Sequence, residues 1–194
     1  MFENLQDERG FFRLWTAQTK PVLDCILKEG RAVAKTAYVD QKYQEAAWVF
    51  QEAYGFFRKA LAERLPAPEG AETPYWLQCS ERFVFQGAGS WLLELAVPQE
   101  RVLLFEREKW EKVLNLSYIG KDAAEEAAFS EELLRAGLST SFEAFATPFY
   151  PMQKQKIKKS WERLFERTAE EPDKLAAAVW EIRKEDLVRY QEAG

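Results

Sequence analysis

The chemistry open to this chain is limited first by a side chain that it lacks. Its 194 residues include no histidine. Histidine is the usual proton carrier near neutral pH and a member of Ser-His pairs, Cys-His pairs and most zinc sites. Any catalysis must therefore use carboxylates, lysine, arginine, tyrosine, cysteine, serine or threonine. We predict no metal site, because Cys25 and Cys79 lack a paired spacing and two cysteines do not complete a usual zinc shell.

A basic segment near the C-terminal end is the first candidate site. Residues 152–167 predict an amphipathic helix in which Ile157, Trp161 and Leu164 form the apolar side. The candidate binding residues on it are Lys154, Lys156, Lys158, Lys159 and Arg163. A basic helical face is most often a solvated surface, and the functional alternative is a face that binds an anion or a partner. Both interpretations stay open for this segment.

A late glutamate, Glu181, is the second candidate. The apolar run 175–182 predicts a final strand, and alternation places Glu181 on the same face as Ala177 and Val179. The carboxylate would then lie at the end of an apolar stripe. That position fits a pocket, and it equally fits a strand end that reaches solvent. The polar residues of the first predicted strand that could face the same cleft are Arg13, Thr16 and Gln18.

The order of the elements around these residues resembles the layout of ADP-ribosyltransferase-type domains. In such domains a glutamate on a late strand orients the nicotinamide ribose. The resemblance therefore implies an NAD-using enzyme with Glu181 as its key carboxylate. These folds commonly carry histidine or arginine on the first strand, and here Arg13 is the nearby candidate. NAD is expected as a cofactor under this alternative alone, and no cofactor is expected otherwise.

The clearest structural unit in the sequence spans residues 91–120. Apolar residues alternate over 91–97, as in a strand with one buried face, and Pro98 ends this pattern. Residues 102–105 are apolar throughout, as in a short buried strand, and helical spacing begins at Glu108. This unit predicts a strand, a turn, a second strand and a helix.

The N-terminal part of the chain predicts one strand and two helices. Residues 11–18 are rich in aromatic residues and predict the first strand. A short helix follows, with Thr19 as its cap and Gly30 as the left-handed residue at its end. Residues 40–65 then carry the longest helical pattern in the chain, with an aromatic stripe that we interpret as core.

The middle of the chain predicts further strands and a turn. Residues 75–79 and 82–86 have strand-like composition. Gly87 and Gly89 predict a hairpin turn, because the sequence GAGS precedes a strand and lacks the lysine of a phosphate-binding loop. Residues 122–136 predict an acidic helix.

Together these elements predict one α+β domain over residues 1–194. We expect a mainly antiparallel sheet of about five strands, packed by the long helix 40–65. The region 121–167 is expected to form a helical layer within the domain. The seven Trp, seven Tyr and fourteen Phe residues favour a folded protein over a disordered one.

Charge and hydropathy exclude several classes of protein. The net charge of -5 argues against a general nucleic-acid binder, which usually carries a basic excess. RNA remains a lesser option, since aromatic residues and a basic helix suit single strands. No apolar run reaches the roughly 18 to 20 residues that cross a bilayer, and the N-terminus is acidic, unlike a signal peptide. We therefore expect a cytoplasmic protein that does not bind membranes.

Several short segments together resemble one family. They are LWTAQ, AAWVF, PYWLQ, VLLFEREKWEKVLN, SWERLF and VWEIRKEDLV, and they occur in the same order as in the bacterial domain of unknown function 3841. The resemblance implies a stand-alone bacterial domain without an assigned activity. We therefore expect a binding or interaction domain for a protein partner or a small anionic ligand, with the ADP-ribosyltransferase-like enzyme as the alternative.

Overall fold

The computed structural model describes residues 5–36 and 47–192 of the chain. Its strands are β1 (Phe11–Thr19), β2 (Arg31–Val33), β3 (Tyr75–Gln78), β4 (Ser90–Pro98), β5 (Leu103–Glu106), β6 (Leu175–Val179), β7 (Glu181–Arg183) and β8 (Leu187–Glu192). Its α-helices are α1 (Lys20–Glu29), α3 (Ala47–Arg64), α4 (Arg107–Leu114), α5 (Ala123–Arg135), α6 (Ser141–Phe145) and α7 (Pro151–Ser160). Short 3-10 helices are η2 (Glu81–Phe83), η3 (Gln99–Arg101), η4 (Trp161–Phe165), η5 (Pro172–Lys174) and η6 (Lys184–Asp186).

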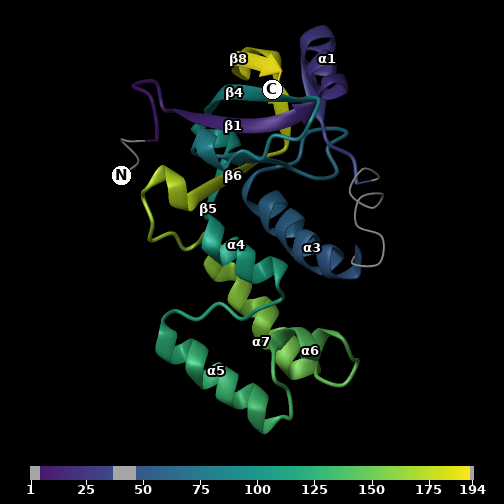
Figure 1. The fold of residues 1–194 in the computed structure, drawn as a ribbon, viewed down its shortest axis with the longest axis vertical. Coiled ribbons are helices and arrows are strands. Elements are labelled where there is room, and N and C mark those ends of the chain that lie inside the picture. Colours follow the sequence, from purple (N-terminus) through teal and green to yellow (C-terminus); the bar gives the residue numbers. More distant parts are fainter. Residues whose placement is uncertain (1–4, 37–46, 193–194) are drawn as a thin grey trace. The chain divides into compact units, whose positions relative to one another are not determined.

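The main sheet has six strands in the order β5-β6-β3-β1-β4-β8, and β2 pairs with β7 in a separate two-stranded sheet (Figure 1). β1 is antiparallel to β3 and β4, β3 to β6, and β4 to β8. The predicted α+β class and antiparallel sheet are therefore confirmed, with six strands in the main sheet where about five were expected.

The chain divides into two compact units, which is a finer division than the single domain predicted for residues 1–194. Unit 1 consists of Met1–Lys42, Leu61–Leu104 and Ala169–Gly194, and unit 2 consists of Tyr43–Ala60 and Phe105–Thr168.

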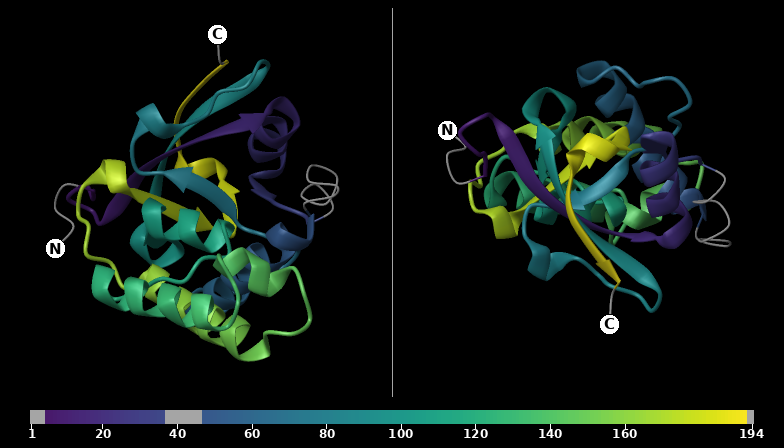
Figure 2. Two further views of the ribbon diagram at one scale, coloured as in Figure 1. Left: turned by 60° about the horizontal axis from the view of Figure 1, so that its bottom comes forward. Right: turned by 90° about the horizontal axis from the view of Figure 1, so that it is seen from above.

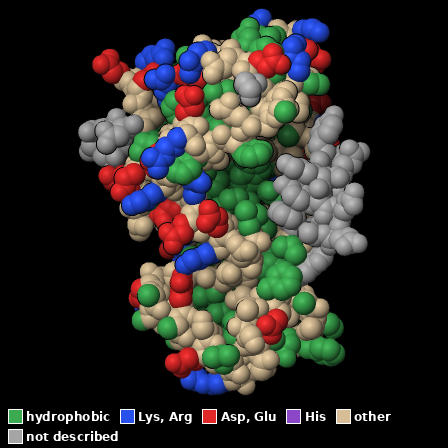
Figure 3. All heavy atoms as spheres, viewed as in Figure 1, with side chains coloured by type: hydrophobic (Ala, Val, Ile, Leu, Met, Phe, Trp, Pro, Cys, Tyr) green, Lys and Arg blue, Asp and Glu red, His purple; other side chains and the backbone are tan. Residues whose placement is uncertain are grey.

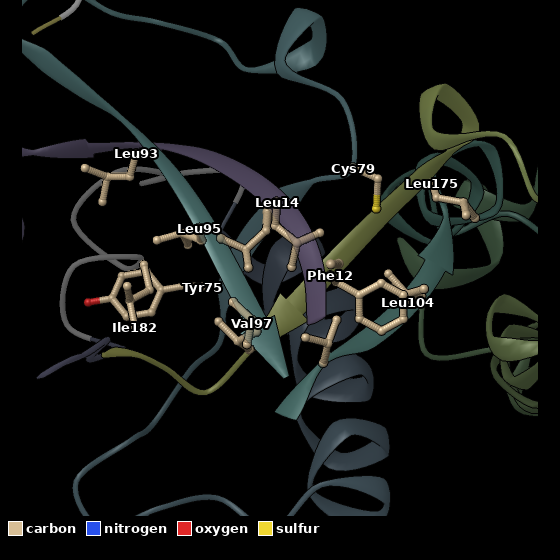
Figure 4. Packing of buried hydrophobic residues seen from close by; sticks show 14 of the residues in the cluster. Phe12, Leu14, Tyr75, Cys79, Leu93, Leu95, Val97, Leu104, Leu175 and Ile182 are labelled. Atoms are coloured by element: carbon tan, nitrogen blue, oxygen red, sulfur yellow. The ribbon is translucent and has the colours of Figure 1, made fainter. Parts of the chain in front are cut away.

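The core of unit 1 follows from the alternation along β1 and β4. Leu14 lies opposite Leu95 in the register of these strands, and both side chains are buried. Figure 4 shows these two side chains close together, with Val97 beside them. The apolar faces of both strands are thus directed into one layer, and the apolar face predicted for residues 91–97 is part of it.

The short helix α1 begins and ends close to where the sequence predicts. It starts directly after β1 (Figure 2), and a proline lies in its first turn. Gly30 follows it with φ 86° and donates its backbone N–H to Ile26 O at 3.1 Å. Thr19 occupies the N-cap position, but its side chain makes no capping hydrogen bond.

The predicted strand 82–86 is wrong. Residues 81–83 form the 3-10 helix η2, and Phe85 is 89% exposed. The aromatic alternation of this segment therefore does not bury a face. The glycine turn is present, since Ser90 N donates to Gly87 O at 3.0 Å. It is not a hairpin, however, because β1 lies between β3 and β4 in the sheet.

The predicted final strand 175–182 is also wrong in one respect, because it breaks at Trp180. β6 pairs with β3 in the main sheet, whereas β7 pairs with β2 in the small sheet. The indole Nε1 of Trp180 donates to Leu65 O at 2.7 Å, which fixes the bend. Glu181 therefore does not continue the face that Ala177 and Val179 share.

In unit 2 the helices are close to those predicted. α3 confirms the long helix, of which residues 40–46 lie outside the described residues. α5 begins after Asp122, whose side chain accepts from Glu125 N at 2.8 Å. The basic segment forms α7 and then continues as the 3-10 helix η4. Trp161 is fully buried and stacks on Phe145, with ring centroids 6.0 Å apart.

Candidate functional site

A groove of about 590 Å³ lies in unit 2 between α5 and the α7-η4 segment. Its lining residues are Tyr118, Glu125, Ala128, Phe129, Glu132, Lys156, Lys159, Ser160, Glu162, Arg163 and Glu166. We call it the α5–α7 groove, and the two helices that border it are labelled in Figure 1.

Two ion pairs join the helices on either side of this groove. Lys156 Nζ lies 2.6 Å from Glu132 Oε1, and Arg163 Nη1 lies 3.1 Å from Glu125 Oε2. Glu125 precedes Glu132 in the sequence but pairs with Arg163, which follows Lys156. The segment α5 therefore runs antiparallel to α7 and η4. The two glutamates are seven positions apart in the sequence, and so are the two cations. Seven positions correspond to about 10 Å along a helix at 1.5 Å per residue. The pairs therefore bound the groove at two points.

The wall between these ion pairs is partly aromatic. Phe129 of α5 stacks on Tyr118, with ring centroids 4.2 Å apart and planes inclined by 19°. Phe129 is only 6% exposed, so the half-buried Tyr118 supplies most of the aromatic surface of the groove. The groove thus combines an aromatic surface with charged edges.

Three of the five predicted binding residues line the groove, namely Lys156, Lys159 and Arg163. Lys158 instead pairs with Glu52, and Lys154 donates to the backbone oxygen of Thr147. Helical spacing explains why these two lysines lie outside the groove. Lys156, Lys159 and Arg163 are three and four residues apart and therefore share one face of the helix, whereas residues 154 and 158 lie on the opposite face. This spacing could have distinguished the two groups in the sequence.

The cations that line the groove differ in whether a carboxylate pairs with them. The hydrogen bond with the Tyr118 hydroxyl outweighs burial and holds the pKa of Arg163 above its ordinary value. The backbone N–H of Lys121 lowers the pKa of Glu125, and Arg163 lowers it further. Within the described part of the chain, the side chain of Lys159 makes no hydrogen bond or ion pair. Lys159 is therefore the cation that remains available to a ligand.

The predicted late glutamate lies in a different arrangement in unit 1. Glu181 is buried, with 4% of its surface exposed. Its Oε2 accepts from Arg31 Nη1 at 2.8 Å, and its Oε1 accepts from Arg183 Nε at 2.6 Å. Burial raises the pKa of Glu181, but the hydrogen bonds from Arg31 and Arg183 outweigh it, so that the pKa lies below its ordinary value.

A hollow of about 120 Å³ borders Glu181, Arg183, Arg101 and Trp180. Pockets that enclose organic ligands usually measure about 300 to 1,000 Å³. A dinucleotide is therefore much larger than this hollow. Both carboxylate oxygens of Glu181 already accept hydrogen bonds from the guanidinium groups of Arg31 and Arg183. The carboxylate is therefore poorly placed to orient a ribose.

The predicted first-strand residues do not form one hydrogen-bonded set with Glu181. The Thr16 hydroxyl donates to Trp76 O at 3.1 Å and accepts from Gln18 Nε2 at 2.9 Å. Arg13 lies on the opposite face of β1, three residues away, and donates from Nε to Glu94 at 2.6 Å. Thr16 and Gln18 are thus bonded to each other, whereas Arg13 and Glu181 each have other partners.

Two buried carboxylates escaped the sequence analysis. Glu94 of β4 is 3% exposed and accepts hydrogen bonds from Arg13 and Arg189. Asp186 is buried too, and Arg101 contacts both of its oxygens, at 2.7 and 2.9 Å. The signal for Glu94 was an acidic residue inside the apolar run WLLELAV, since a charge in such a run is rarely buried without a partner.

Among the described residues, no group of three or more cysteine or acidic side chains is arranged to hold a metal ion. Among the same residues, no helix combines the length and the apolar character needed to cross a membrane.

Comparison with known proteins gives one match. The family model described as Domain of unknown function (DUF3841) matches residues 13–188. No curated protein and no solved structure matches the chain significantly.

Proposed function

Since the chain belongs to the DUF3841 family, whose description assigns no activity, we propose from its own geometry that it is a binding domain. The α5–α7 groove is its ligand site. The observation that carries this proposal is the position of Lys159, whose side chain lies at the edge of a partly aromatic groove and has no partner among residues 5–36 and 47–192. Apolar surface with a few converging polar groups is the usual character of a ligand site.

A small anionic ligand fits this groove better than an extended protein partner. The groove has a volume within the small-molecule range and is bounded by two ion pairs. On the face drawn in Figure 3, Lys and Arg side chains are interspersed with Asp and Glu side chains. A mixed surface of this kind offers no broad field for steering a strongly charged protein or an RNA strand. A protein partner is therefore the second candidate for the same groove.

The enzyme alternative has no comparable observation in its favour. Glu181 is buried between two arginines, and the adjoining hollow is small. The proposal places the domain in the bacterial cytoplasm, where the two free thiols of Cys25 and Cys79 would stay reduced.

The test is a binding screen on the isotope-labelled full chain, followed by NMR. One arm uses a library of small organic acids, amines and neutral compounds, and the other uses a pool of random 12-residue peptides. We expect small acids to shift the backbone resonances of α5 and α7, and this shift to be lost in Lys159→Glu. Lys158→Glu is the matched control, because Lys158 lies outside the groove and pairs with Glu52.

If neither arm shifts groove resonances, the proposal is overturned. If a compound binds equally well to wild type and Lys159→Glu, the groove is not the site and the proposal fails as well. Binding of peptides alone would favour the protein partner over the small ligand.

A further inference from the structure

We propose that the α5–α7 groove selects an organic monoanion with a flat apolar body, such as an aromatic carboxylate. This inference rests on the proposed function and names the class of ligand.

The charges of the groove leave room for one anionic group. Lys156 and Arg163 already hold Glu132 and Glu125, respectively. Lys159 lies between them on the same helical face and, among the described residues, has no partner. A ligand with one carboxylate can therefore bind Lys159 without displacing either glutamate.

A ligand with several charges would meet repulsion in the same place. Besides Glu125 and Glu132, the groove is lined by Glu162 and Glu166. Since the bounding ion pairs are about 10 Å apart, a ligand between them lies within about 5 Å of a carboxylate, which is less than the Debye length of about 8 Å at physiological salt. Screening is therefore incomplete, and a second or third negative charge on the ligand would lack a cation. Inorganic phosphate and nucleotides are expected to bind weakly.

The body of the ligand is defined by the aromatic wall. Phe129 stacks on Tyr118 and is only 6% exposed, so the aromatic surface open to a ligand is mainly that of the half-buried Tyr118, with the exposed Ala128 also lining the groove. A flat ring can lie against this surface in an offset or edge-on arrangement, which adds to the free energy of burying its apolar area. The ligand therefore combines one ring system with one carboxylate.

The experiment uses 2-naphthoate as the probe and isothermal titration calorimetry on the full chain. Its neutral isostere 2-naphthamide tests the charge, and inorganic phosphate tests an anion without an apolar body. The variants are Lys159→Gln and its matched control Lys158→Gln. Thermal unfolding of each variant checks that the fold is unchanged, as expected for two exposed lysines.

We expect 2-naphthoate to bind wild type and Lys158→Gln with similar affinity, and to bind Lys159→Gln about tenfold or more weakly, as for loss of a charged hydrogen bond. We expect 2-naphthamide to bind wild type more weakly by a similar factor. Equal affinity of the acid and the amide, or equal affinity of the two variants, would overturn the inference.

The outcome also separates this inference from the proposed function. If phosphate or the peptide pool shifts the groove resonances while 2-naphthoate does not bind, the ligand class is wrong and the groove remains a binding site. If no probe of any class shifts those resonances, both proposals fall.

Discussion

The carboxylate of Glu181 bridges two arginines that lie far from each other in the sequence. Its Oε2 is 2.8 Å from Arg31 Nη1, and its Oε1 is 2.6 Å from Arg183 Nε. β2 and β7 carry these residues as paired strands, with Val33 opposite Glu181 and Arg31 opposite Arg183. The small sheet therefore brings both cations to one buried anion, which indicates a structural role for this carboxylate.

The first prediction concerns the contribution of Glu181 to stability. Glu181→Gln should lower the free energy of unfolding by about 1 to 3 kcal/mol, because it removes charged hydrogen bonds to a buried group. Chemical denaturation measures this difference. Glu185→Gln is the control, since Glu185 is 68% exposed and 3.7 Å from Arg183, and it should change stability by less than about 0.5 kcal/mol. Equal effects of the two substitutions would contradict the structural role.

The same pair of proteins addresses the enzyme alternative. After incubation with NAD, we expect no nicotinamide release by wild type or by Glu181→Gln. Release by wild type that is lost in a stably folded Glu181→Gln would instead support an ADP-ribosyltransferase-like activity.

The second prediction is a pH dependence that follows from the lowered pKa of Glu181. A carboxyl group whose folded pKa lies below its ordinary value of 4.5 stabilises the folded state above that value. The contribution is lost as the pH falls through the folded pKa, where both states become protonated. The stability gap between wild type and Glu181→Gln should therefore be constant from pH 7 to about pH 5 and shrink below pH 4.5. Denaturation curves across this range measure the gap, and a gap that widens on acidification would have the wrong sign.

Local patterns predicted the elements whose signal lies within a few residues. β4 was predicted from alternation, β1 from its aromatic composition, and α5 from its acidic residues. The break at Trp180 was missed, because an apolar run does not show which sheet each half of it joins.

The candidate site was predicted only in part for a similar reason. The cations Lys156, Lys159 and Arg163 share a helical spacing that is visible in the sequence. The glutamates that pair with two of them belong to α5, and this pairing depends on how the helices pack. The sequence therefore indicates a basic face, whereas the part of the chain that the structure describes holds partners for two of these side chains and none for that of Lys159.

The third prediction compares two N-cap positions. Asp122 accepts a hydrogen bond from Glu125 N at 2.8 Å, whereas the Thr19 side chain makes no capping bond. Asp122→Ala should lower the free energy of unfolding by about 1 kcal/mol, the usual effect of losing an N-cap. Thr19→Ala should have a clearly smaller effect. The two substitutions are compared by urea denaturation, and a larger loss for Thr19→Ala would show that the capping roles are reversed.

The last prediction compares two aromatic residues of unit 2 that differ in burial. Trp161 is fully buried, stacks on Phe145 and donates its indole N–H to Ser117 O at 2.8 Å. Trp161→Ala should therefore lower the free energy of unfolding by about 3 to 5 kcal/mol, the range for deleting a large buried ring. Phe149 is 80% exposed, and Phe149→Ala should cost less than about 0.5 kcal/mol.

Denaturation of both variants under the same conditions tests this comparison. If Trp161→Ala does not fold, Trp161→Phe provides the measurement, because it keeps a ring in the core and removes the hydrogen bond to Ser117. It should cost more than Phe149→Ala, since it leaves the backbone oxygen of Ser117 without this donor and creates space in the core. A cost for Trp161→Phe no greater than that for Phe149→Ala would show that Trp161 does not anchor α7 and η4, which carry the three cations of the α5–α7 groove.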